Sequence, residues 1–451
     1  MKELFAWWQE TPKTEKIIQA LVFLLVFGYA GRGSGAYVSI PTGLAVAFIL
    51  YDCVRKKSLA GFCMPMVYWL PMCLFIGSVW LSSLLLGDAE SIHLANQYIY
   101  WSLPFFLMMY LARQADVRYA ALLGAIIAML GVSIYTVYLN YRVLHGLPIS
   151  GLAAGGRLTP WLYYNTHALM LLGPLPLLLC AFMDKKLIQN KLYLMMLCVT
   201  IVLGSWALWK TGSRGAFTGL CVGGFVIFLL RYYCHAIWKV AGVLAVSFIV
   251  LIAGHMFWGF TPGGDHGYDD TTRVRMAVSS YAMWKDHKWC GVGLANWQLQ
   301  YQKKYIQVKA IKNAAKKFYT EKIQKAGKKV TKKGIDSAVQ QALNIERRYP
   351  HPHNVAAYFI STTGTIGGIG YLCFLAGYLI LFVRKIIKYP REWMLYAGIW
   401  IFIAMSLHGL VDLGISYKGA ARLLYMMIGL TFSFCFVKGS NNDEEICTEK
   451  E

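Results

Sequence analysis

Charged side chains are scarce in this chain, and their scarcity excludes the commonest class of protein. Of 451 residues, 15% are Asp, Glu, Lys or Arg, whereas 57% are hydrophobic, and the mean hydropathy is +0.46. A soluble domain of this length needs more polar surface than that. The apolar residues form continuous runs without the polar–apolar alternation of β-barrel strands. We therefore predict an all-α, polytopic membrane protein.

Motifs for metal, nucleotide and disulfide chemistry are also missing. The eleven cysteines form no C-x-x-C pair, and only Cys290 falls in the one large loop between apolar runs. The ten histidines include no H-E-x-x-H, and no phosphate-binding loop sequence occurs. A disulfide framework is therefore not expected, and we predict neither a metal nor a cofactor.

Apolar runs predict twelve transmembrane helices, near residues 16–30, 36–54, 60–86, 93–112, 119–139, 165–183, 192–209, 216–231, 240–258, 353–383, 393–412 and 421–437. With both termini inside, 19 Lys and Arg lie on the cytoplasmic side, against 7 in the short outer loops. The positive-inside rule favours this orientation. We interpret the first run as a retained span, because its removal as a leader would spoil the charge asymmetry.

The prediction divides the chain into four parts: spans one to nine in residues 1–258, a periplasmic loop at 259–352, spans ten to twelve in 353–438, and a cytoplasmic tail at 439–451. The loop carries 18 Lys and Arg against 7 Asp and Glu, and we expect it to be mostly helical. Trp297, Tyr301 and Tyr305 recur at helical spacing, which predicts an amphipathic helix lying on an interface. The lysine-rich stretch 303–333 is either a solvated surface or a site of attraction for anionic headgroups and lipid-linked phosphates.

His353 is the candidate base, because it stands where the basic loop enters the tenth span. A neutral imidazole can accept a proton near neutral pH. Asn354 can cap the following helix, and Gly364 and Gly367 allow close helix packing. A satisfied interfacial histidine is the alternative. His351 is a rival base, but its place between two prolines favours a rigid spacer.

Arginines predicted on the same outer side are candidates for binding an anion. Arg214 follows Ser213 in a very short turn, and the cost of a mid-bilayer charge places it at the outer mouth. Arg273 and Arg275 begin the first strong helix of the loop. Two positions two residues apart face different ways, so at most one should join Arg214 and the other should be solvated.

Arg157 precedes Asn165 at the outer start of the sixth span, and both are further candidates. For all these arginines, snorkelling or surface exposure is the structural alternative.

One potential base and several arginines suit a particular reaction. Guanidinium groups bind phosphate bidentately and stay charged at any relevant pH. The set fits deprotonation of a hydroxyl while a phosphate leaving group departs. Outside the cytoplasm no ATP is present, so the donor must already store the energy, as a sugar chain on a lipid pyrophosphate does.

Three stretches resemble the O-antigen ligase and O-antigen polymerase (WaaL/Wzy) superfamily. They are His353-Asn354 with Gly364-Thr365-Ile366-Gly367, then Thr211-Gly212-Ser213-Arg214-Gly215, and then the run from Arg273 to Asn296. Lys288 stands where the family usually has proline, and the lysine-rich insert is longer and more basic than is usual.

The resemblance implies a GT-C-like glycosyltransferase of lipopolysaccharide biosynthesis in the bacterial inner membrane. It would move a glycan from undecaprenyl pyrophosphate to a lipid A–core sugar at the periplasmic face, without a metal and with inversion. By position, His353 would be the base, Arg214 and Arg273 would hold the pyrophosphate, and Arg275 would be the second choice. We favour a ligase over a polymerase. A protein O-oligosaccharyltransferase and a transporter of lipid-linked substrate stay open.

Overall fold

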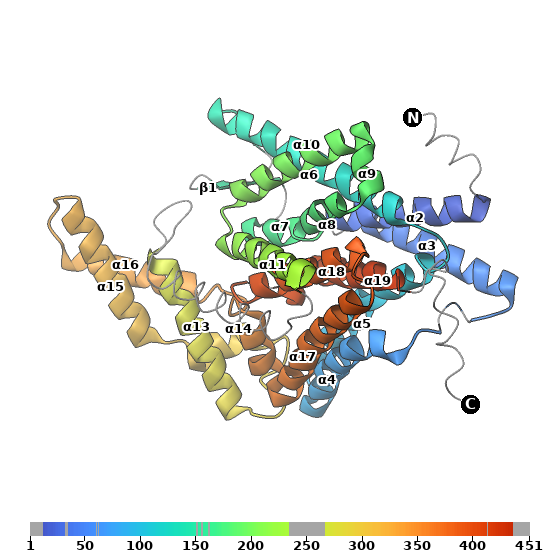
Figure 1. Ribbon diagram of the computed structural model, residues 1–451. Helices are drawn as coiled ribbons and strands as arrows, with labels where there is room; N and C mark the ends of the chain where they lie inside the picture. The colour runs from blue at the N-terminus through green and yellow to red at the C-terminus, as the bar shows by residue number, and fades with distance from the viewer. Residues whose placement is uncertain are drawn as a thin grey trace.

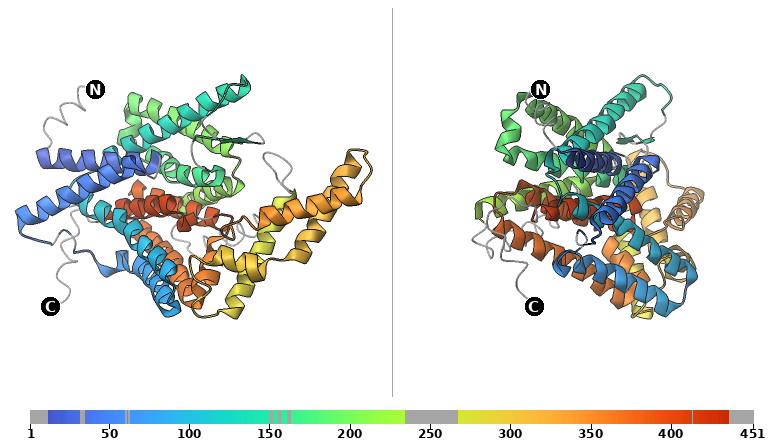
Figure 2. Two further views of the ribbon diagram at one scale, coloured as in Figure 1. Left: turned by 180° about the vertical axis from the view of Figure 1, so that it is seen from behind. Right: turned by 90° about the vertical axis from the view of Figure 1, so that its right-hand side faces the viewer.

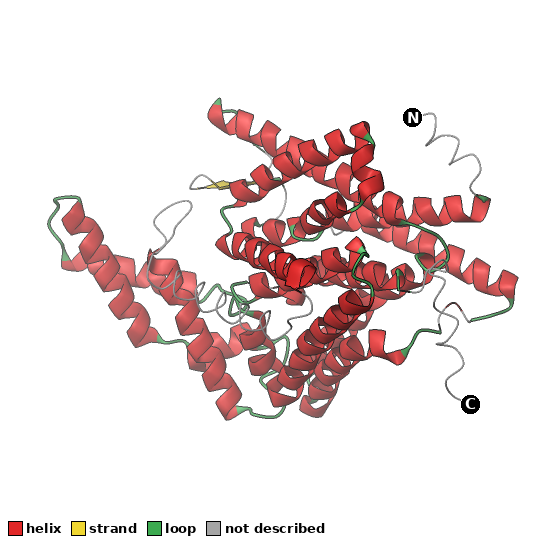
Figure 3. Cartoon of the chain, viewed as in Figure 1, coloured by secondary structure: helices red, strands yellow, loops and turns green. Residues whose placement is uncertain are grey.

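Helices make up nearly all of the molecule. The computed structural model describes residues 12–31, 35–59, 61, 63–149, 152–154, 157–160, 163–233, 267–412 and 414–435. Within them, one small antiparallel sheet joins β1 (Leu152–Ala154) to β2 (Arg157–Thr159) (Figure 3). The predicted all-α fold is confirmed.

The apolar helices follow the predicted spans. They are α2 (Lys13–Gly31), α3 (Ala36–Lys56), α4 (Leu70–Leu86), α5 (Ala89–Leu111), α6 (Arg118–Leu144), α10 (Lys191–Thr211), α11 (Arg214–Tyr233), α17 (Val355–Lys388), α18 (Trp393–Gly409) and α19 (Lys418–Ser433). Seven described segments are long and apolar enough to cross a membrane, and α4 and α18 are shorter apolar helices. The ninth predicted span, 240–258, lies outside the described residues, so the total of twelve stays a prediction.

Two spans differ from their predicted form because of proline. The third begins only at Leu70, after the 3-10 turn η2 (Met66–Tyr68). The sixth is broken into α7 (Tyr164–Leu171) and α8 (Pro174–Cys180), and then continues as η3 (Ala181–Met183). Pro174 has no N–H to donate, and its ring crowds the preceding turn, so the helix restarts there. The short α9 (Lys185–Gln189) follows.

The centre of the bundle is aromatic. Phe75 of α4 has its ring centroid 4.9 Å from that of Phe359 in α17 and 5.9 Å from that of Tyr98 in α5, both edge to face. Phe374 of α17 lies 5.8 Å from Phe402 of α18. All five rings are buried, and such pairs contribute about 0.5–1.5 kcal/mol each beyond their buried area. They fix α17 between α4 and α18.

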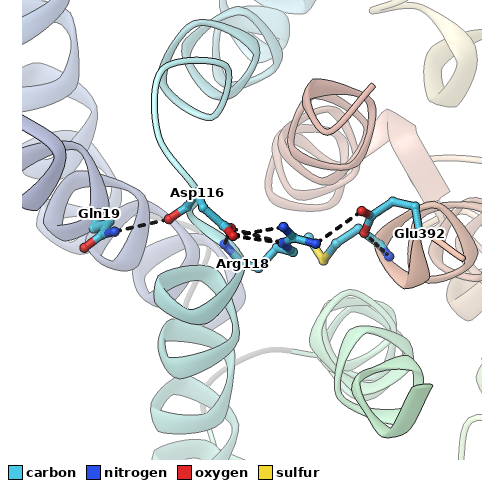
Figure 4. A network of polar contacts seen from close by, with 5 residues as sticks. Gln19, Asp116, Arg118 and Glu392 are labelled. Atoms are coloured by element: carbon cyan, nitrogen blue, oxygen red, sulfur yellow. Dashed lines mark hydrogen bonds and ion pairs between the residues drawn. The ribbon is translucent and has the colours of Figure 1, made fainter. Parts of the chain in front are cut away.

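A polar network ties the helices together near the starts of α6 and α18 (Figure 4). The Arg118 guanidinium contacts Asp116 at 2.9 Å and Glu392 at 3.3 Å. Gln19 of α2 donates to the backbone carbonyl of Asp116 at 3.2 Å. Glu392 also caps α18 by accepting from the backbone N–H of Met394. This network fixes the ends of three helices relative to one another.

The described part of the predicted loop is helical. It contains α13 (Gly267–Asp286), α14 (Trp297–Gln300), the π-turn η4 (Tyr301–Tyr305), α15 (Val308–Lys325) and α16 (Lys332–Glu346). Figures 1 and 2 show these helices projecting from the bundle on the side opposite to the two chain ends.

The three aromatic residues predicted to share one apolar side do so. Trp297, Tyr301 and Tyr305 are at most 8% exposed, and they form one cluster with Met276 and Met283 of α13. The three rings do not lie on one continuous α-helix, however, because α14 has only four residues and is followed by η4. The apolar side is therefore part of a core that α14 and η4 share with α13.

Candidate functional site

His353 stands in the joint between Pro352 and α17, with its backbone in a conformation that is unusual for its residue type. Its φ of 51° lies in the left-handed region, where few residues other than glycine are found. Its ring contacts those of Tyr349 and His351, at centroid distances of 5.4 and 4.4 Å. Strained backbone of this kind persists where the surroundings enforce it, as at functional sites.

Asp412, just beyond α18, determines how the His353 ring is oriented. Its Oδ1 lies 3.0 Å from His353 Nδ1, and the carboxylate side chain is 8% exposed. Burial by itself raises the pKa of Asp412, but the hydrogen bond with His353 and the neighbouring imidazoles outweigh it and hold the pKa below its usual range. An ionised carboxylate can only accept, so Nδ1 of His353 donates, and in the neutral ring Nε2 is then the nitrogen that carries the lone pair.

His351 supports this arrangement from the other side. Its Nδ1 accepts the backbone N–H of His353 at 3.3 Å. Burial lowers the pKa of His351 to about 3, with His353 acting in the same direction and Asp412 opposing them. A neutral ring is the form that can accept this bond. His351 thus contacts the candidate base directly through this hydrogen bond, in addition to any role as the predicted rigid spacer.

The short turn that precedes Arg214 meets the same end of α18. Ser213 Oγ lies 3.2 Å from Nε2 of His408, and both residues are buried. A side chain at Gly215 would overlap Val411, so only glycine lets α11 approach α18 this closely. Arg214 is the first residue of α11 and is partly buried. The stretch from His408 to Asp412 therefore contacts both His353 and the turn that contains Ser213.

The two arginines of α13 have different surroundings. Arg273 is partly exposed, and its charge acts on His408. The other, Arg275, is buried, and its Nε donates to Glu346 at 2.9 Å, with Thr272 also in contact. The prediction that one of the pair would be solvated is wrong. The buried carboxylate of Glu346 engages that guanidinium and anchors α16 on α13.

Arg157 contacts the turn that leads to Arg214, and Asn165 lies on the helix that follows Arg157 in the chain. Arg157 donates to the carbonyl oxygen of Gly212 at 2.9 Å, and its guanidinium lies 5.1 Å from the ring centroid of Tyr164. Gly212 has a φ of 62°, and a side chain there would collide with Arg157. Arg157 therefore holds the turn from outside, while Asn165 lies in the first turn of α7, partly buried.

The part of α17 around Gly364 joins the helical bundle to the turn at residues 288–294. Gly364 has a φ of 63° and a ψ of −160°, which interrupts the helix and releases carbonyl groups. The carbonyls of Ser361 and Thr362 accept from the backbone N–H groups of Val292 and Gly293, each at 2.9 Å. Gly364 was predicted to allow close helix packing. In the structure, it instead lets the turn at residues 288–294 bind to the backbone of α17.

Two other sequence-predicted residues of α17 also have defined places. Asn354 caps the helix, as predicted, by accepting the N–H of Ala357 at 2.8 Å, and its amide donates to the carbonyl of Leu410. Asn354 therefore provides a second link between the start of α17 and the end of α18. At Gly367, a side chain would collide with Thr363 of the same helix.

Sequence reasoning missed Asp412 and His408. A signal was present, because His408 and Asp412 stand four residues apart at the end of an apolar run, where ionisable residues are costly and usually functional. Nothing in the sequence connected that run to His353, which lies 59 residues away from Asp412.

The same cluster is also a donor set that a metal ion could use. One ligand atom each from His351, His353 and Asp412 lie within 4.8 Å of one another. Two imidazoles and a carboxylate suit zinc. In the present arrangement, the Nδ1 atoms of both histidines take part in hydrogen bonds within the cluster. Activity measured with and without a chelator distinguishes a metal site from a metal-free cluster in which His353 is the base.

One comparison with known proteins supports the resemblance. Residues 199–372 match the family model described as O-Antigen ligase, whereas no curated protein is detectably similar to the chain. The matched region holds Ser213, Arg214, Arg273 and His353, and ends before His408 and Asp412. This part of the chain is therefore similar to the O-antigen ligase family, which agrees with the resemblance to the O-antigen ligase and polymerase superfamily.

Proposed function

We propose that this protein is a membrane glycosyltransferase that moves a glycan from undecaprenyl pyrophosphate to a hydroxyl group of a lipid A–core sugar. The observation that supports this most is the hydrogen-bonded pair of His353 and Asp412, which lies just beyond the end of α18 that Ser213, the neighbour of Arg214, contacts through His408. The family consists of membrane glycosyltransferase-like enzymes, which agrees with this chemistry.

In the proposed reaction, His353 is the base. Its Nε2 takes the proton of the acceptor hydroxyl as that oxygen bonds to the anomeric carbon of the donor. The bond from the anomeric carbon to pyrophosphate breaks on the opposite face, and the leaving group takes the electron pair. The product therefore has inverted configuration. Asp412 keeps Nδ1 protonated and stabilises the imidazolium that forms, as the carboxylate of a catalytic triad does.

Arginine side chains are proposed to bind the pyrophosphate. Charge accumulates on its oxygens as the bond to sugar breaks, so fixed cations stabilise the transition state more than the ground state. Arg214 and Arg273 are the two candidates, and Arg157 supports the turn before Arg214. Arg275 is excluded from our proposal, because Glu346 engages its guanidinium.

We place this chemistry at the periplasmic face of the bacterial inner membrane, on a GT-C-like protein of lipopolysaccharide biosynthesis. The charge asymmetry of the sequence supports that orientation. Neither a metal nor another cofactor has a step in the mechanism. The polymerase alternative differs only in the acceptor, which would be a second lipid-linked glycan.

An assay with defined substrates tests the proposal. Purified protein is incubated with an undecaprenyl pyrophosphate–linked glycan, with or without lipid A–core, and products are identified by mass. Glycan on lipid A–core is the expected result. Elongated donor formed without acceptor would establish the polymerase instead. Donor left intact in both mixtures would reject glycosyl transfer.

A further inference from the structure

The lysine-rich stretch forms a defined structural element, which we call the basic arm: α15, the turn after it and α16, residues 308–346. A small core of Ile311, Ala315, Ala342 and Leu343 holds the two helices together. Thr331 caps α16 by accepting the N–H of Gly334. The arm is therefore a folded helical hairpin with a fixed surface.

The charge on this surface is nearly all of one sign. The arm contains ten lysines, all of them exposed, against two exposed acidic residues, Glu321 and Asp336. Of these ten lysines, Lys317 is the one that pairs with a carboxylate among the described residues, that of Glu321. Lys312 and Lys316 stand four residues apart on one helix face, where like charges repel. The arm thus carries an electrostatic cost that an anionic partner would relieve.

The arm is attached to the candidate site directly. At the end of α16, Glu346 is buried and binds both Arg275 of α13 and the hydroxyl of Tyr301, the latter at 2.7 Å. The exposed Arg347 and Arg348 follow, and the ring of Tyr349 then contacts that of His353. Basic side chains therefore run from the site to the turn at the far end of the arm.

The direction of the arm distinguishes between anionic partners. Figures 1 and 2 show α15 and α16 extending away from the helical bundle, on the side opposite to the chain ends. A membrane-binding helix would lie along the bilayer surface beside the bundle. A partner chain that runs from the site along the arm, away from the helical bundle, fits this geometry better than a layer of lipid headgroups does.

We propose that the basic arm binds the glycan chain of the donor, and that this glycan is acidic, with carboxylate groups along its length. The inference rests on the proposed function and adds the substrate class. Exposed lysines spread over two helices favour a polyanion that contacts several of them at once. The charged contacts would hold the chain near the site while its reducing end reacts.

Binding of a model polyanion to the purified full-length protein tests this inference without relying on transfer. The probe is fluorescent polygalacturonate, with dextran of equal length as the neutral control. The arm variant carries Lys325→Gln, Lys328→Gln, Lys329→Gln, Lys332→Gln and Lys333→Gln. The matched variant replaces five exposed lysines outside the arm: Lys13→Gln, Lys57→Gln, Lys185→Gln, Lys186→Gln and Lys191→Gln.

We expect polygalacturonate to bind the wild type in a salt-sensitive manner, and the arm variant to bind about tenfold or more weakly. The matched variant should bind as the wild type does, and dextran should not bind. In the transfer assay, the arm variant should have a higher KM for an acidic donor at unchanged kcat, and unchanged kinetics with a neutral donor.

Equal polymer affinity of the two variants, or loss of binding only to phosphatidylglycerol vesicles, would overturn the inference. Polymer binding without transfer from any donor would instead reject the proposed function.

Discussion

Asp412 is the residue that the structure adds to the proposed chemistry, and its replacement tests that addition. In Asp412→Asn, the carboxamide can donate to Nδ1 of His353 and favour the wrong ring tautomer. We expect transfer to fall by about 10²-fold or more, with donor binding unchanged. The measurement is single-turnover transfer by protein of normal abundance.

A conservative variant separates orientation from packing. Asp412→Glu keeps the acceptor and should retain part of the activity, whereas the amide should not. Equal rates for Asp412→Asn and the wild type would show that this carboxylate does not position the base.

The two arginines of α13 should give opposite results. Arg273→Met should lower transfer by about 10²–10³-fold with stability unchanged, as expected for a donor to a developing charge. Arg275→Met should instead lower the free energy of unfolding by about 3–5 kcal/mol, because Glu346 is left buried and unpaired.

Thermal unfolding and transfer rates, measured on both variants, check this assignment. The double variant Arg275→Met with Glu346→Leu should recover most of the stability. Wild-type transfer by Arg273→Met would remove that arginine from the site.

How much of the site the sequence predicts depends on distance along the chain. His353, Asn354 and Ser213 were found because each stands in a local pattern at the end of a span. Asp412 and His408 were missed because only the packing of α17, α18 and α11 brings them to those residues. For Arg275, the sequence could not show its partner, which lies 71 residues further on.

At the scale of elements, the interruption of α17 is the feature most sensitive to substitution. Gly364→Ala places a side chain in a backbone conformation reserved for glycine, and its Cβ would overlap the carbonyl oxygen of Trp289. We expect the turn at 288–294 to undock and the protein to lose abundance and transfer. Gly368→Ala is the matched control, because its Cβ would meet only ordinary contacts at 3.5 Å. Similar abundance of the two variants, measured by immunoblot, would contradict this account.

Hydropathy predicted where the helices lie along the chain, but it did not predict where a helix is interrupted. A continuous apolar run predicts a span, and it does so even where Pro174 divides the helix into α7 and α8. At the break, the N–H groups of Leu172 and Gly173 donate to carbonyl groups of the preceding turn, an arrangement that hydropathy does not reveal. Likewise, the sequence predicted that Trp297, Tyr301 and Tyr305 share one buried side, but it did not reveal that α13 packs against them.

At the scale of the whole molecule, the orientation in the membrane is open to a direct test. The charge asymmetry predicts the basic arm outside and α9 inside. An epitope inserted after Gly327 should be reached by antibody in intact spheroplasts, whereas one inserted after Gln189 should need permeabilised cells. Gly327 lies in an exposed turn and Gln189 is the exposed last residue of α9, so insertion should be tolerated at both sites. The opposite pattern of labelling would reject the periplasmic location of the site.

The central claim is that His353 accepts the proton of the acceptor hydroxyl, and one comparison of variants tests it most directly. Transfer by purified protein is measured with lipid-linked donor and EDTA for the wild type, His353→Ala, His353→Asn and His351→Ala. Asparagine tolerates the left-handed backbone at this position, so His353→Asn separates lost chemistry from lost folding. We predict that both His353 variants bind donor without transferring it, that His351→Ala transfers at a reduced rate, and that EDTA has no effect on the wild type. Transfer by His353→Asn that exceeds that of His351→Ala, or a strict requirement for metal, would contradict the mechanism.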